Sequence, residues 1–195
     1  MNTLVLYANQ KRLTNVVINQ VYEKEENNKI MINILSNVVG TYNKESCEHI
    51  LHIRIATQML LRRLVEKTDV YPLTESDIHL IATASSLHDI GKVGISKDVL
   101  NKPTKLTDEE FEIMKTHTLI GAKMIENMEY PSDKPLVKTA YEICRWHHER
   151  FDGKGYPDGL KGNEIPISAQ VVSIADAFDA LTSTRVYKNA YDYRT

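Results

Sequence analysis

The sequence predicts an all-α fold, and three observations support this. Apolar residues recur every three or four positions through most of the chain, which is typical of helices with one buried face. Two of these apolar runs are preceded by N-capping signals, Thr74–Asp77 and Thr107–Glu110. No stretch alternates polar and apolar side chains for long enough to form a sheet.

The apolar spacing and the turn residues place the individual helices. In the first helix of the main domain, Ile50, Ile53 and Leu60 share one face. Glycines and prolines between residues 151 and 166 indicate an ordered, turn-rich loop before the last helix. Helices are expected over residues 45–67, from Thr74 until Gly91 and Gly94 end it, from Thr107, from His117, over 138–148 and over 168–184.

Length and composition describe an ordinary globular chain. It has 195 residues, 42% of them hydrophobic, and 24 basic against 26 acidic residues give a net charge of −2. This balance argues against a nucleic-acid-binding protein, and no apolar run reaches the roughly 18–20 residues that span a membrane. The start of the chain has no leader pattern, which predicts a cytoplasmic protein. The two cysteines, Cys47 and Cys144, form no disulfide framework and are expected to be reduced thiols.

Residues 1–42 differ in character from the rest. They are polar and rich in asparagine, and Leu13, Val17 and Val21 follow helical spacing. Two interpretations remain open: a short coiled coil that forms a homodimer, or a linker helix that caps the next domain. We therefore expect a helical linker over 1–42 and one domain over 43–195.

His88 and Asp89 are the strongest local sign of chemistry. Adjacent side chains on a helix diverge by about 100°, so both can serve one site only at a helix end or with metals between them. An imidazole beside a carboxylate that can bridge is a usual start for a two-metal hydrolytic centre. A single His-Asp pair is weak evidence, because it is also common at the surface end of a helix.

Other candidate ligands accompany the pair. Most of the seven histidines stand beside carboxylates or in pairs, and His147 and His148 close a predicted helix. Asp176 lies within an apolar run, where a carboxylate must pair with an arginine or bind a metal to be buried. Glu45 and His49 are four residues apart and could ligate together, although a solvated helix face explains this pair equally well.

Three motifs together resemble the HD-GYP family. They are His88–Lys92, Asn101–Pro103 and the long signature His147–Leu160, with Asp179–Ser183 and Arg185 extending the match. The family consists of metal-dependent phosphodiesterases of cyclic di-GMP, a subgroup of the HD phosphohydrolases. The resemblance therefore implies an HD-domain helical bundle with hydrolase activity.

The resemblance also implies a role for each matching residue. Asp89 would bridge two metals, and Glu45 would allow a third; iron or manganese is expected. His88, Asp89 and Lys92 would be catalytic, with Lys92 on a substrate phosphate. The implied metal ligands are Glu45, His49, His88, Asp89, His117, His147, His148 and Asp176. The implied contacts to the nucleotide are Lys92, Gly155, Tyr156, Arg185 and Lys188, and a packing role is the alternative for Tyr156.

The expected reaction opens cyclic di-GMP to the linear dinucleotide pGpG, with onward cleavage to GMP left open. The domain would be a signalling output module behind a receiver or sensory domain absent from this chain, and its C-terminus would be cut short at Thr195. Two alternatives are a catalytically silent binding module and a hydrolase of another cyclic dinucleotide, such as hybrid cyclic GMP-AMP. One departure is His52, where the family usually has arginine; we expect it to support or pack beside the site.

Overall fold

The computed structural model describes residues 47–128 and 133–182, together with positions 11–12, 14–16, 18–19, 30 and 34. The chain divides into two compact units, residues 1–35 and 36–195. In the first unit the described positions are helical and carry exposed apolar side chains such as Val16 and Ile18. Leu13, Val17 and Val21, on which the coiled-coil interpretation depends, lie outside the described residues.

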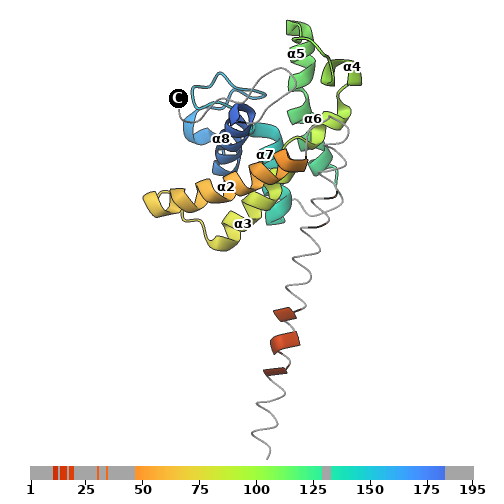
Figure 1. Ribbon diagram of the computed structural model, residues 1–195. Coiled ribbons are helices and arrows are strands. Elements are labelled where there is room, and N and C mark those ends of the chain that lie inside the picture. The colour runs from red at the N-terminus through yellow and green to blue at the C-terminus, as the bar shows by residue number, and fades with distance from the viewer. Residues whose placement is uncertain are drawn as a thin grey trace, which may run out of the picture. The chain divides into compact units, whose positions relative to one another are not determined.

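Every regular element described in the second unit is a helix, which confirms the all-α prediction. Figure 1 shows the described α-helices of this unit, and three short 3₁₀ helices, named η1 to η3, lie between some of them. In chain order the elements are α2 (Cys47–Lys67), α3 (Glu75–Ala84), η1 (Ser85–Leu87), η2 (Ile90–Gly94), α4 (Lys97–Leu100), α5 (Asp108–Lys115), α6 (His117–Glu126), α7 (Pro135–Trp146), η3 (Gly162–Glu164) and α8 (Ile167–Thr182).

The core lies among five of these helices. Helix α2 packs against α3 and α8, and α7 packs against α3, α6 and α8. Ile53, Leu61, Ile143 and Val172 are completely buried where these helices meet. Burying such a side chain contributes about 1.5–3 kcal/mol to stability, so this cluster fixes the helices that carry the site.

Helix α3 begins as predicted but ends earlier. Thr74 forms the expected capping box with Asp77. The prediction that the helix continues to Gly91 is wrong, because α3 stops at Ala84 and the chain proceeds through η1 and η2. The reason is geometric: on one continuous helix His88 and Asp89 would diverge, whereas between two short 3₁₀ helices both point to one centre.

Gly91 is required by a close approach of two backbones. A Cβ atom at this position would lie 1.9 Å from the carbonyl oxygen of His117 and 2.4 Å from the amide nitrogen of Gly121. No side chain fits between them, so η2 packs directly on the first turns of α6. This contact sets the distance between Asp89, just before η2, and His117, the first residue of α6.

The remaining helices match the predictions with shifted ends. Thr107 caps α5 through the expected capping box with Glu110. The helix expected over 138–148 starts at Pro135, in the first turn where proline is favourable, and ends at Trp146. The short elements α4 and η3 were not predicted. None of the described helices has the length and hydrophobicity needed to span a membrane.

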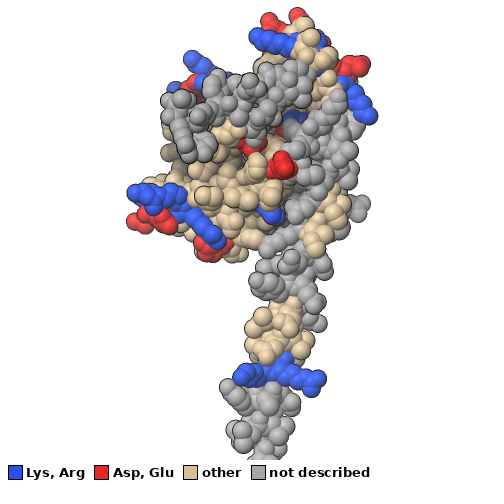
Figure 2. Space-filling model, viewed as in Figure 1, with Lys and Arg blue, Asp and Glu red and all other residues tan. Residues whose placement is uncertain are grey.

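In Figure 2, charged side chains gather at two ends of the face shown, near α4 and α5 and near the turn between α2 and α3, and acidic side chains also lie on the surface between these ends. These ends contain exposed ion pairs, for example between Arg62 and Glu75 and between Lys115 and Glu112. Such pairs contribute about 0–1 kcal/mol each and keep the ends solvated.

Candidate metal centre

Seven candidate ligands form two adjacent groups. In each group, the potential ligand atoms all lie within 4.8 Å of one another. The first group is Asp89, His117, His147 and His148, and the second is His49, His88 and Asp176. These are seven of the eight ligands expected from the sequence; the eighth, Glu45, lies outside the described residues.

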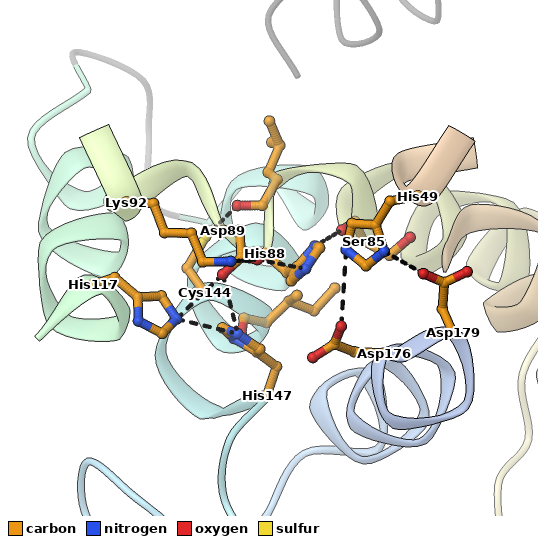
Figure 3. Close-up of polar contacts among 12 residues, drawn as sticks. His49, Ser85, His88, Asp89, Lys92, His117, Cys144, His147, Asp176 and Asp179 are labelled. Carbon is orange, nitrogen blue, oxygen red and sulfur yellow. Dashed lines mark hydrogen bonds and ion pairs between the residues drawn. The ribbon is translucent and has the colours of Figure 1, made fainter. Parts of the chain in front are cut away.

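The ligands come from different parts of the helical bundle, which explains why they meet only in the fold. His49 is on α2 and Asp176 on α8, and these two helices pack together. His88 and Asp89 lie between η1 and η2, His117 begins α6, and His147 and His148 follow α7. Figure 3 shows His88 and Asp89 between His117 and His147 on one side and His49 and Asp176 on the other.

Asp89 links the two groups. Its Oδ1 atom is 3.2 Å from Nε2 of His117 and 3.7 Å from Nε2 of His147. Its Oδ2 atom is 3.0 Å from Nε2 of His88 in the other group. A carboxylate whose two oxygens face different sets of imidazoles is suited to bridge two cations.

Backbone carbonyls hold three of the imidazoles in the orientation a metal requires. Nδ1 of His88 lies 2.9 Å from the oxygen of Ser85, Nδ1 of His117 2.7 Å from that of Met114, and Nδ1 of His147 2.8 Å from that of Ile143. A ring nitrogen beside a carbonyl oxygen carries the hydrogen, so the Nε2 lone pair faces the centre. These nitrogen and carboxylate donors fit iron, manganese or zinc better than magnesium or calcium.

The electrostatics favour the protonation states of metal ligands. Burial by itself raises the pKa of Asp89, but Lys92 and the nearby histidines outweigh it, so the pKa lies well below its ordinary value. Burial lowers the pKa of His147 and, together with the neighbouring imidazoles, strongly lowers that of His148. The carboxylate is thus ionised and these imidazoles are neutral, as ligation requires.

Lys92 brings a positive charge to the edge of the centre. Its Nζ atom lies 2.6 Å from Oδ2 of Asp89, one helical turn away, and its side chain is largely buried. The ion pair fixes the ammonium beside the two groups of ligands (Figure 3). Chemically, this arrangement can neutralise an anion that approaches the centre.

Asp179 contacts a candidate ligand, although in the sequence analysis it was quoted only within a motif segment and given no role. Its Oδ2 atom lies 2.6 Å from Nδ1 of His49 and its Oδ1 atom 2.8 Å from Nδ1 of His52. The buried carboxylate therefore orients His49, as backbone carbonyls orient the other imidazoles. The three-residue spacing of Asp176 and Asp179 on one helix was the available signal. His52 supports the site through Asp179, the kind of role expected for it.

Tyr156 lies against the first group of ligands. Its ring stacks on His148, with centroids 4.8 Å apart and planes at 25°. The loop that carries it is anchored by Glu149, whose Oε1 accepts hydrogen bonds from the amides of Asp158 (2.7 Å) and Gly159 (3.0 Å). Buried Glu149 thus fixes this loop next to the histidines that it follows in sequence.

Gly155 has a structural explanation of its own. A Cβ atom there would lie 2.3 Å from the amide nitrogen of Arg150 and 2.4 Å from Cα of Glu149. The loop therefore folds back on its own beginning, and only glycine allows this approach. Close packing alone requires the glycine, whether or not it also contacts a ligand.

Other candidate residues are not in the described site. Arg185, Lys188 and the side chain of Cys47 lie outside the described part of the chain. Cys144 is completely buried, and its thiol contacts the carbonyl oxygen of Leu87 at 3.2 Å. Burial raises the pKa of Cys144, so the thiol is protonated and unreactive, in agreement with the ordinary reduced thiol expected from the sequence.

The fold and the site together define an all-helical domain in which adjacent His88 and Asp89 belong to two neighbouring groups of side chains that could hold metal ions. Residues 29–195 match the HD domain family, so the chain belongs to this family. This confirms the fold class and the family resemblance drawn from the motifs.

Individual relatives agree with the family. The chain is 36% identical over 96% of its length to a 3'3'-cGAMP-specific phosphodiesterase 2 of Vibrio cholerae, covering 34% of that protein. It is 38% identical over 95% of its length to a cyclic di-GMP phosphodiesterase of the same organism, covering 39% of it. It is 50% identical over 60% of its length to a cyclic di-GMP phosphodiesterase of Thermotoga maritima, covering 31% of it. The chain thus spans about a third of the length of these relatives.

Proposed function

We propose that this chain is the catalytic domain of a metal-dependent phosphodiesterase that opens cyclic di-GMP to pGpG, with a second cleavage to GMP left open. The observation that carries the proposal is the sharing of Asp89 between two ligand groups beside the loop that bears Tyr156. Two neighbouring cations are suited to a phosphodiester, which is anionic and a poor electrophile. The relatives named as cyclic di-GMP phosphodiesterases support the substrate class.

The proposed cofactors are two divalent metal ions, iron or manganese, or three if Glu45 also ligates. The seven described candidates form one group of four and one group of three, and each group would hold one ion. Metals bound there would lower the pKa of a coordinated water and neutralise charge on the phosphate. We assign His88, Asp89 and Lys92 as the catalytic residues: His88 and Asp89 would hold the metals, and Lys92 would neutralise the phosphate beside them.

The chain's own cations and its Tyr156 loop would hold the substrate. Lys92, fixed by Asp89, supplies a positive charge to a phosphate oxygen next to the metals. Tyr156 offers its ring and hydroxyl from a loop that is rigidly anchored. Gly155, Arg185 and Lys188 complete the proposed contacts to the nucleotide.

The proposal also covers how the domain is controlled and what residues 1–42 do. The domain over 43–195 acts as a cytoplasmic signalling output, controlled by a receiver or sensory domain that this chain does not contain. Residues 1–42 link the two and provide the surface of a homodimer. Sedimentation of the chain with and without residues 1–42 tests the dimer.

Hybrid cyclic GMP-AMP is the second candidate substrate, because a relative that matches 96% of the chain is named for it. The test is steady-state hydrolysis of both cyclic dinucleotides by the manganese- or iron-loaded chain. We expect a higher kcat/KM for cyclic di-GMP. The opposite order would assign the domain to the hybrid substrate, and hydrolysis of neither would favour a silent binding module.

Asp179→Asn should weaken the second ligand group selectively. The amide cannot take the charge of the carboxylate and no longer fixes the tautomer of His49, and such changes typically cost about 10–100-fold in metal affinity. Manganese titration followed by calorimetry should show one of two binding steps weakened, with the other unchanged. Asp98→Asn, at an exposed position of α4, is the matched control. Equal weakening of both steps, or of neither, would contradict this role.

A further inference from the structure

Helix α5 places an aromatic ring and an ammonium group next to Tyr156. The ring of Phe111 meets that of Tyr156 edge to face, with centroids 6.4 Å apart. Nζ of Lys115 lies 5.1 Å from the centroid of the Phe111 ring and 5.6 Å from that of Tyr156. Because Tyr156 itself stacks on His148, these side chains continue outward from the first ligand group.

Packing does not explain why Phe111 is there. The residue is 45% exposed, and no residue of α5 is fully buried. Helix α5 is nevertheless fixed at its start by the capping box of Thr107. Lys102, which follows α4, also forms an ion pair with Glu110 of α5. Figure 1 shows α4 and α5 together at one end of the domain, next to α6. Singly exposed apolar side chains are common on protein surfaces; what distinguishes Phe111 is its contact with Tyr156, which stacks on the candidate ligand His148.

We propose that Phe111 and Lys115 form, with Tyr156, the subsite for the part of the substrate away from the cleaved phosphodiester. This inference rests on the proposed function. A cyclic dinucleotide carries two bases and two phosphates, and a two-metal centre engages only one phosphodiester at a time. The second half must therefore lie on the surface beside the metals, and the outward continuation through Tyr156 leads to α5.

The chemistry of the two residues matches that half of the substrate. An exposed aromatic ring stacks on a nucleobase and tolerates different bases. Lys115 lies against both rings as a cation–π contact, and its ammonium is a point charge suited to the second phosphate. Glu112 competes for this ammonium at 2.6 Å, but Glu112 is exposed and such a surface pair is weak enough to yield to a phosphate.

The test measures binding and turnover of cyclic di-GMP by the metal-loaded chain and its Phe111→Ala and Lys115→Met variants. Removing a stacking ring typically weakens binding about tenfold, so we expect Kd and KM to rise about tenfold for Phe111→Ala, with kcat changed less than about threefold. Lys115→Met keeps the stem of the side chain and should raise Kd less at high salt than at low salt. Ile113→Ala is the matched control, because Ile113 is an equally exposed residue of α5 with 47% exposure.

The outcomes distinguish failure of the subsite from failure of the proposed function. If the parent chain cleaves cyclic di-GMP and the two variants bind it as tightly as Ile113→Ala does, the subsite is wrong and the proposed function stands. If the parent binds the dinucleotide without cleaving it, the binding comparison alone still tests the subsite. If the parent does not bind it at all, the subsite is overturned together with the proposed substrate. Metal content, measured on every variant, must equal that of the parent for a loss of affinity to support the subsite.

Discussion

Asp89→Asn should reduce turnover of cyclic di-GMP by at least about a thousandfold. The substitution keeps the shape of the side chain but removes the charge that two cations would share. The substitution affects both ligand groups, because Oδ1 of Asp89 faces His117 in the first group and Oδ2 faces His88 in the second. Metal content by mass spectrometry should fall together with turnover.

Loss of turnover supports the role of Asp89 only if the Asp89→Asn variant is folded. Far-ultraviolet circular dichroism should be unchanged, because the core formed by Ile53, Leu61 and Val172 is separate from Asp89. Asp98→Asn is the control for a neutralised carboxylate away from the site. Turnover of Asp89→Asn within tenfold of the parent would be incompatible with a shared carboxylate in catalysis.

Gly155→Ala has the second largest expected effect. The new Cβ atom would lie 2.3 Å from the amide nitrogen of Arg150, so the loop must move and Tyr156 must leave its place on His148. A displacement of about 1 Å in a binding group can cost about a hundredfold in rate, and we expect that loss in kcat/KM for cyclic di-GMP.

Metal binding separates this effect from damage to the centre. None of the seven described ligands lies in the loop over residues 151–166, so Gly155→Ala should retain the metal content of the parent. Lys154→Ala, an exposed neighbour in the same loop, should behave as the parent does. A variant that loses metal in proportion to its activity would show that the loop supports the centre instead of the substrate.

Local signals predicted most of the fold. Both capping boxes, at Thr74 and Thr107, depend on residues three positions apart, and both are formed. The end of α3 at Ala84 could not be predicted in this way, because the glycines that suggested a longer helix lie in η2, where Gly91 is required by its contact with α6. In the sequence, a glycine required by a distant backbone looks the same as a glycine that ends a helix.

The candidate site was likewise predicted only in part. Motif resemblance named seven side chains that the fold brings into two groups, although His49 and His117 are unremarkable in their own segments. The role of Asp179 was missed because its partner, His49, is 130 residues away. Phe111 and Lys115 were missed because on α5 they look like one face of an ordinary surface helix. Only their contacts with Tyr156 connect them to the site.

In the proposed function, the domain hydrolyses a cyclic dinucleotide with two metal ions held on either side of Asp89. The most direct test of this function is one anaerobic preparation on which metal content and products from cyclic di-GMP are measured together, before and after treatment with a chelator. The account predicts at least two iron or manganese ions per chain, pGpG as product, loss of both on chelation, and recovery on adding metal. Two bound ions with no linear product would contradict it, as would hydrolysis that continues after the metals are removed.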